Sequence, residues 1–273
     1  VAEKARLAHP KVSGVLLFAR NYENPIQLKA LTQAIHEVKT PALTIYVDQE
    51  GGRVQRFETG FTPLPPLRHW GELYSSMPNK ALDGAFWHGL TLAQELKLHG
   101  VDASFAPVVD LFNPISSIIG TRAFDSNPEI VIKLARKMID GLHEGGMPAI
   151  LKHFPGHGNL VGDTHTEQVT DTDHTLEALL TKDLLPFRVL AQAVEGVMVA
   201  HTQHIQIDPK YIASQSKKWI QAILKNQLGF SGKVFSDDLS MEASKTHDFQ
   251  TVCQKTLDAG CDFLVCGQWW GEL

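Results

Sequence analysis

Short apolar runs alternate with amphipathic stretches along the whole chain. The apolar runs are rich in Val, Ile, Leu and Phe and lack clean polar alternation, which is typical of parallel strands covered on both faces. We predict seven such strands: Gly14–Ala19, Ala42–Asp48, Ala103–Asp110, Ala149–Phe154, Gly196–His201, Lys233–Leu239 and Asp262–Gly267.

The stretches between these strands carry recognisable helix ends. Asn24 with Pro25, and Asn127 with Pro128, each give a capping side chain followed by a proline that suits the first helical position. Ser216 is predicted to cap a third helix. Apolar residues recur at helical spacing behind each cap, so one face of each helix should pack inward.

Alternating strands and helices predict an α/β fold with a parallel sheet and right-handed crossovers. We expect a single-domain (β/α)8 TIM barrel over residues 1–273, because no linker, composition shift or low-complexity tract divides the chain. Seven strands are visible where a barrel has eight, so the first strand is expected to precede Val1. An open doubly wound sheet is the alternative, but no GxGxxG motif follows the first predicted strand.

Composition and charge narrow the class of partner. A formal net charge of −5 gives no basic footprint, so we expect no nucleic-acid partner. No apolar run approaches the ~20 residues of a membrane-spanning helix, and no signal peptide opens the chain. We therefore expect no membrane partner and a cytoplasmic location. Three cysteines without CxxC spacing argue against a disulfide framework or a zinc site.

Charged side chains gather where the predicted strands end, and the carboxyl ends of barrel strands form the face on which active sites are built. For Asp110 and Asp238, a structural role and a functional role both stay open. Glu50 is expected to cap a helix, and His201 to be a satisfied structural histidine. The strand-end residues in question are Asp48, Asp110, Lys152, His153, His201, Asp237 and Asp238.

Several blocks resemble the bacterial β-N-acetylglucosaminidases of glycoside hydrolase family 3, the NagZ type. The most specific block is Lys152-His-Phe-Pro-Gly-His-Gly158, followed by Asp163-Thr-His165. Three further blocks occur in the family's order: Asp48-Gln-Glu-Gly-Gly-Arg-Val-Gln-Arg56, Arg122-Ala-Phe-Asp125 and Phe235-Ser-Asp-Asp-Leu-Ser-Met241. The given residues depart from the family's pattern in three places: no first strand is seen before Val1, no final helical segment is recognisable after Gly267, and the loop 159–162 is less polar than expected.

The resemblance implies a retaining exo-β-N-acetylglucosaminidase that removes terminal N-acetylglucosamine from muropeptides during peptidoglycan recycling. It places the nucleophile on Asp237 and the acid/base on His165, assisted by Asp163. We expect a monomer whose partner is a small glycan, with no cofactor and no metal. The substrate contacts implied by the resemblance fall on Asp48, Arg56, Arg122, Lys152 and His153.

These residue types suit the chemistry. A retaining glycosidase needs a carboxylate to attack the anomeric carbon and a second group to protonate the leaving oxygen. Asp237, at a strand end, would be rigidly held, and Lys152 could favour its ionised form. A histidine with an unperturbed pKa of about 6.5 can donate a proton and then accept one. Asp163 could fix the tautomer of His165, on a loop that could swing in when sugar binds.

Two other classes of function compete with this interpretation. A metal-dependent hydrolase could take its ligands from His153, His157, His165, His201 and Asp237. The spacing argues against it, because no HxH closes a strand and no HExxH is present. A catalytically silent glycan-binding barrel would predict loss of Asp237 or His165, and both are present. A β-glucosidase of the same family would usually take its acid/base from a second domain.

Overall fold

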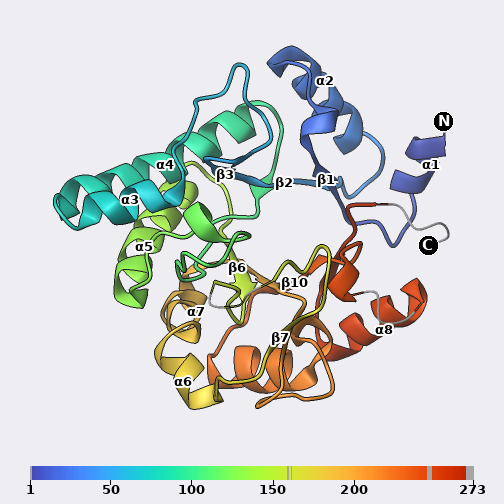
Figure 1. The fold of residues 1–273 in the computed structure, drawn as a ribbon. Coiled ribbons are helices and arrows are strands. Elements are labelled where there is room, and N and C mark those ends of the chain that lie inside the picture. The colour runs from blue at the N-terminus through green and yellow to red at the C-terminus, as the bar shows by residue number, and fades with distance from the viewer. Residues whose placement is uncertain (1, 159, 161, 245–247, 269–273) are drawn as a thin grey trace.

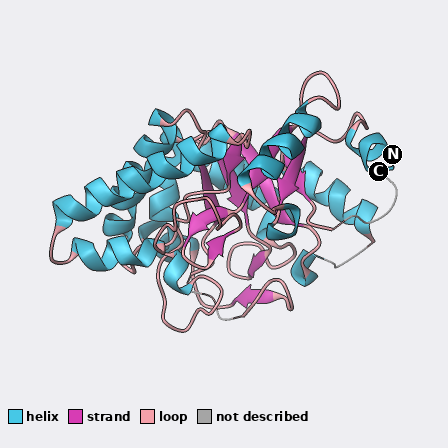
Figure 2. Cartoon of the chain, turned by 90° about the horizontal axis from the view of Figure 1, so that it is seen from above, coloured by secondary structure: helices cyan, strands magenta, loops and turns pink. Residues whose placement is uncertain are grey.

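The computed structural model describes residues 2–158, 160, 162–244 and 248–268. Strands occupy the middle of the molecule and helices surround them (Figures 1 and 2). The main strands are β1 (Gly14–Leu17), β2 (Thr44–Val47), β5 (Ala103–Ser104), β6 (Ile150–Phe154), β8 (Gly196–Val199), β10 (Lys233–Asp238) and β11 (Phe263–Val265). The helices are α1 (Ala2–Leu7), α2 (Pro25–His36), α3 (Leu67–Tyr74), α4 (Pro78–Leu98), α5 (Pro128–Glu144), α6 (Leu176–Thr181), α7 (Leu184–Leu190), η5 (Lys218–Gln227) and α8 (Phe249–Ala259).

The seven main strands are all parallel and follow one another in chain order. They form two hydrogen-bonded sheets, β1-β2-β5 and β6-β8-β10-β11. A parallel bridge between Val108 and Lys152 joins the sheets, and the N–H of Ile150 donates to the carbonyl of Ala106 at 2.8 Å. Among the described residues, no backbone ladder connects β11 to β1. The predicted α/β fold of the TIM-barrel type is confirmed, with seven parallel strands in the two main sheets of the described chain.

Each of the seven predicted strands is present, although the regular part of every one is shorter than predicted. Short accessory strands lie beyond the barrel strands: β3 (Gln49–Gly51) pairs with β4 (Val54–Gln55), and β7 (Val169–Asp171) with β9 (Thr202–His204). Short helical turns complete the chain: η1 (Ala19–Asn21), η2 (Gly120–Arg122), η3 (Ala191–Ala193), η4 (Ala213–Gln215) and η6 (Glu242–Ser244).

The predicted helix caps are also present. Asn24 accepts the N–H of Gln27 at the start of α2, and Asn127 accepts the N–H of Glu129 at the start of α5. The hydroxyl of Ser216 accepts the N–H of Trp219 at 3.1 Å. The helix behind Ser216 is η5, which is wound as a π-helix rather than the expected α-helix. No helix of the described residues is long and apolar enough to cross a bilayer.

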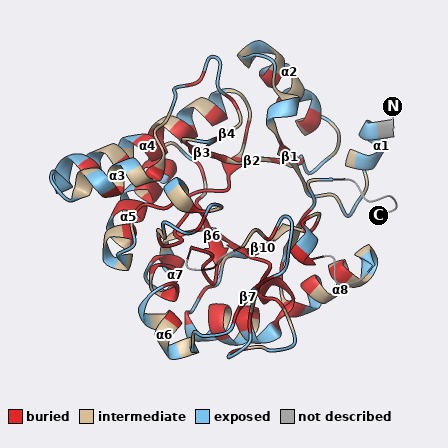
Figure 3. Ribbon diagram, viewed as in Figure 1, coloured by how far each residue is buried: buried red, intermediate tan, exposed pale blue. Residues whose placement is uncertain are grey.

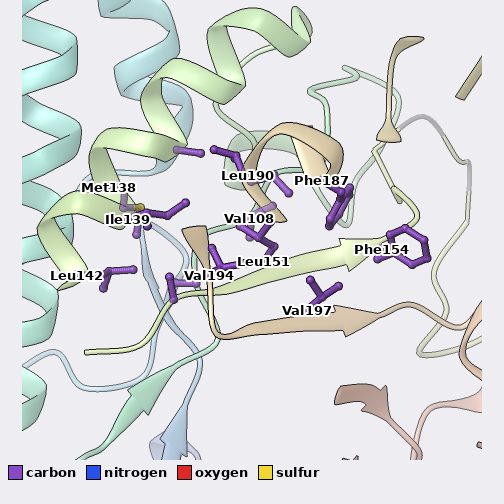
Figure 4. Close-up of a cluster of buried hydrophobic side chains, with 14 of the residues drawn as sticks. Val108, Met138, Ile139, Leu142, Leu151, Phe154, Phe187, Leu190, Val194 and Val197 are labelled. Carbon is purple, nitrogen blue, oxygen red and sulfur yellow. The ribbon is translucent and has the colours of Figure 1, made fainter. Parts of the chain in front are cut away.

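The main core lies between the sheet and the helices, whose outer faces are exposed (Figure 3). Side chains of β6 and β8 pack there against α5 and α7, as Leu151, Val197, Met138 and Phe187 show (Figure 4). A smaller cluster comes from the strands and from Phe105, directly after β5, and lies in the barrel interior. Its members are Ala103, Phe105, Ile150, Met198, Phe235 and Val265, with Leu16, Tyr46 and Phe263 beside them. The core therefore fixes the strand ends on which the polar side chains stand.

Trp219 gives the most direct test of this packing. Its side chain is fully buried, and its ring meets Phe154 edge to face with centroids 5.8 Å apart. We expect Trp219→Ala to lower the free energy of unfolding by about 3–5 kcal/mol, because it leaves a large cavity. Trp87 is 60% exposed on α4, so Trp87→Ala should change it by less than ~0.5 kcal/mol. Urea unfolding measures both variants, and similar losses would contradict the described packing.

Candidate active site

A buried carboxylate, that of Glu50 on β3, lies at the centre of the charged cluster at the carboxyl ends of the strands. Only 1% of Glu50 is exposed. Its oxygens accept hydrogen bonds from Arg122, at 2.9 Å from Nε and 2.7 Å from Nη2. Its Oε1 also lies 2.5 Å from Nζ of Lys152. One carboxylate therefore binds two cations that come from elements far apart in the sequence.

Lys152 connects this centre to Asp48, which follows β2. Nζ of Lys152 donates a 2.8 Å hydrogen bond to Oδ1 of Asp48, whose side chain stays 22% exposed. The other oxygen of Asp48 lies 3.9 Å from Nη2 of Arg56. Nε of Arg56 is buried and has no acceptor among the described residues. A polar ligand at this edge would meet the exposed carboxylate edge of Asp48 and the exposed part of the Arg56 side chain.

His153, next to Lys152 on β6, is oriented by a second buried carboxylate. Oδ2 of Asp110 lies 2.6 Å from Nδ1 of His153, and Oδ1 accepts the backbone N–H of His157 at 2.8 Å. Nε2 of His153 lies 3.3 Å from Nη2 of Arg122. If Nδ1 donates to Asp110, Nε2 accepts from Arg122, so the ring has one favoured tautomer. The Asp110 and Glu50 groups are thus joined through His153 and Arg122.

Two adjacent carboxylates end β10, and their contacts separate their roles. Oδ1 of Asp238 accepts the backbone N–H groups of Ser240 and Gly267, both at 2.8 Å, so Asp238 fastens the chain after β11 to β10. Within the described chain, the Asp237 side chain accepts one hydrogen bond, from the N–H of Asp238 at 2.8 Å. Asp237 therefore keeps a carboxylate oxygen available for a ligand, whereas Asp238 is structural.

Asp163 and His165 form a pair on the loop between β6 and β7. Oδ1 of Asp163 lies 2.7 Å from Nδ1 of His165 and accepts its backbone N–H at 2.8 Å. The side chain of His165 is 62% exposed. The N–H of Glu242 donates to the carbonyl of His165 at 3.3 Å, which holds the loop against the turn after β10. An imidazole with one oriented nitrogen thus stands beside the strand that carries Asp237.

The electrostatics keep the carboxylates of the site ionised. Burial alone would raise the pKa of Glu50, but the positive charges of Arg122 and Lys152 outweigh it and hold that pKa well below its ordinary value of 4.5. Burial would also raise the pKa of Asp237. The nearby imidazoles of His153 and His201 outweigh this effect, and the pKa is lowered. A carboxylate nucleophile must be ionised, and Asp237 meets that requirement.

The five predicted substrate contacts are all connected to one cluster in the structure. They are Asp48, Arg56, Arg122, Lys152 and His153. The expected role of Glu50 as a helix cap is wrong, because no helix begins until Leu67 and the side chain is buried between two cations. The sequence directly after Glu50 shows no helical pattern, and this could have indicated that Glu50 is not a helix cap. His201 is satisfied by Ser214 and the carbonyl of Asp238, as expected.

Several known proteins are similar to this chain in sequence and in fold. The sequence profile described as the Glycosyl hydrolase family 3 N terminal domain matches residues 1–270. A β-hexosaminidase of Nitrosomonas eutropha is 48% identical over 267 residues, which cover 97% of this chain and 76% of that protein. Crystal structures of NagZ from Neisseria gonorrhoeae, in complex with N-trifluoroacetyl-D-glucosamine and with a zinc ion, superpose with TM-scores of 0.92 and 0.89. Both are 41% identical and cover 97% of this chain and 77% of their own.

The Glu50 cluster predicts a pH-dependent stability. Because the pKa of Glu50 is lower in the folded chain than its ordinary 4.5, its contribution is present above pH 4.5 and is lost as pH falls below it. Glu50→Gln leaves Lys152 and Arg122 short of a counter-charge, so we expect a loss of about 3 kcal/mol at pH 7. Urea unfolding at several pH values measures the difference between the two proteins. A difference that stays constant from neutral pH to pH 3 would contradict the ionised pairing.

Proposed function

The chain belongs to glycosyl hydrolase family 3, and on that premise we propose that it is a retaining exo-β-N-acetylglucosaminidase. Its substrates would be muropeptides derived from peptidoglycan, from which it removes terminal N-acetylglucosamine during cell-wall recycling. The observation that carries this proposal is the placement of an ionised carboxylate, Asp237, and the Asp163–His165 dyad at the same end of the strands, where the loop of the dyad is hydrogen-bonded to the turn after β10. The similar β-hexosaminidase of Nitrosomonas eutropha and NagZ of Neisseria gonorrhoeae support the same activity.

In the first step, the carboxylate of Asp237 attacks the anomeric carbon and the bond from that carbon to the leaving oxygen breaks. His165 gives its proton to the leaving oxygen, so no alkoxide is released. The product is a glycosyl ester on Asp237. Asp163 stabilises the imidazolium before transfer and keeps Nδ1 of His165 occupied, so that Nε2 carries the mobile proton.

In the second step, His165 acts as the base. A water molecule attacks the anomeric carbon, its proton passes to the neutral imidazole, and the ester bond to Asp237 breaks. The carboxylate and the protonated histidine are then restored. Two displacements at the same carbon retain the β configuration of the sugar.

Sugar recognition would fall to the cluster around Glu50. Asp48 has an exposed carboxylate edge that can accept hydrogen bonds from sugar hydroxyls. The side chain of Arg56 is 33% exposed beside Asp48, so its guanidinium can donate to an oxygen of the ligand. Arg122, Lys152 and His153 are held by buried carboxylates, so their positions are set before substrate binds.

A metal-dependent hydrolase is the second candidate, and the zinc complex of the Neisseria gonorrhoeae protein makes it worth testing. Two of the histidines expected in such a site are occupied otherwise: His153 contacts Asp110 and Arg122, and His201 contacts Ser214 and a carbonyl. The guanidinium beside His153 would repel a cation.

The cytoplasmic location, the monomeric state, the small-glycan partner and the single domain over residues 1–273 stay predictions.

The first test is an assay of the purified protein on a chromogenic β-N-acetylglucosaminide, with and without EDTA. We expect EDTA to leave hydrolysis unchanged. Asp237→Asn should lower kcat by at least ~10³-fold, because the nucleophile is lost.

Asp238→Asn is the matched control, since it also removes a charge from the end of β10 but keeps an oxygen that can accept the N–H groups of Ser240 and Gly267. It should keep most of the activity. Loss of hydrolysis in EDTA would favour the metal-dependent hydrolase. Full activity of Asp237→Asn would show that another group is the nucleophile.

A further inference from the structure

Thr164 stands between the two members of the dyad and differs from both in exposure. Only 1% of Thr164 is exposed, whereas the side chains of Asp163 and His165 are 32% and 62% exposed. Polar residues on exposed loops are mostly exposed themselves, so a buried threonine in such a loop indicates specific contacts with the rest of the protein. Thr164 makes two, through its side chain and through its carbonyl.

The side-chain contact reaches the floor of the site. Oγ1 of Thr164 lies 3.4 Å from Nε2 of His157, within hydrogen-bond range. His157 is itself 1% exposed, and its backbone N–H is held by Asp110 at 2.8 Å. Gly158, the next residue, lies so close to the carbonyl of Leu111 that a Cβ would stand 1.8 Å from it. His157 therefore belongs to the rigid part of the barrel end, and Thr164 fastens the loop to it.

The backbone contact reaches the strand of the nucleophile. The carbonyl of Thr164 accepts the N–H of Ala243 at 3.1 Å, in the turn that follows β10. The hydroxyl of Ser244 in that turn lies 2.7 and 2.8 Å from the carbonyl oxygens of Leu239 and Met241, which share its one hydrogen. Asp237 lies on the same strand, so the position of Thr164 is fixed relative to both Asp237 and the floor of the site.

We propose that Thr164 is a positioning residue that holds the Asp163–His165 dyad over Asp237 through its hydroxyl. This inference rests on the proposed function, because it assigns Thr164 to the steps in which His165 moves a proton. The hydroxyl, not the bulk of the side chain, is the part that fixes the loop. It touches neither the sugar nor the reacting atoms.

The proposal separates two kinds of substrate. A substrate with a poor leaving group, such as an alkyl β-N-acetylglucosaminide, needs a proton from His165 to break its bond to the anomeric carbon. The 2,4-dinitrophenolate group of a dinitrophenyl substrate leaves as a stable anion, so breaking its bond to the anomeric carbon needs no proton. Since kcat/KM reports the steps up to the first irreversible one, misplacing His165 should lower it for the alkyl substrate only.

The experiment compares Thr164→Val, which keeps the shape and removes the hydroxyl, with Thr164→Ser, which keeps the hydroxyl. For Thr164→Val we expect kcat/KM to fall at least about tenfold on the alkyl substrate and less than about twofold on the dinitrophenyl substrate. Thr164→Ser should retain the wild-type pattern. Thr170→Val, at an exposed position on β7, is the control and should match the wild type on both substrates.

A second readout concerns the base step. On the dinitrophenyl substrate, breakdown of the glycosyl ester should limit kcat of Thr164→Val, and azide should restore kcat because this anion needs no base. An equal fall of kcat/KM on both substrates would overturn the proposal, since Thr164 would then serve substrate binding or the fold. Wild-type rates for Thr164→Val would also overturn it. A wild-type protein inactive on both substrates would instead refute the proposed function, and the inference with it.

Discussion

Two cations, Lys152 and Arg122, are held away from water at the carboxyl end of the strands, and the carboxylate of Glu50 makes this possible. A buried charge is costly unless it is paired and hydrogen-bonded. Glu50 supplies a counter-charge and hydrogen-bond acceptors to both cations, and the cations supply the counter-charge and donors to Glu50. Asp48 shares Lys152, and His153 meets Arg122, so the positions of the polar side chains depend on one another. Because β3, β6 and η2 each contribute a member, this cluster also fastens the loops above the barrel to the strands.

The site thus has a fixed part and a part attached to it. The fixed part consists of the Glu50 cluster, the Asp110–His153 pair and the end of β10, whose groups are mostly buried and joined by hydrogen bonds. The attached part is the loop of Asp163 and His165, which meets the fixed part at Thr164 and at the turn after β10. A nucleophile gains from rigidity, whereas an acid/base must reach two oxygens in turn, first that of the leaving group and then that of water. The division of the structure follows this division of the chemistry.

Much of this arrangement could be predicted from the sequence. Apolar runs gave the seven strands, and because parallel strands end on one face, Asp48, Lys152 and Asp237 were expected to meet there. The role of Glu50 could not be predicted, since its burial depends on Arg122, which lies 72 residues away, and on Lys152, still farther along the chain. Such partners come together only through the order of the strands. The π-helical winding of η5 and the contact of Thr164 with His157 depend likewise on packing that local patterns do not encode.

The proposed mechanism requires Asp237 to form a covalent bond to the sugar. Peptide mass spectrometry after rapid quenching tests it most directly, with His165→Ala and a 2,4-dinitrophenyl β-N-acetylglucosaminide, because loss of the base slows breakdown of the ester and lets it accumulate. We expect one added N-acetylglucosaminyl group, and fragmentation should place it on Asp237 rather than on Asp238. A sugar found on any other side chain, or turnover that never labels the protein, would contradict it.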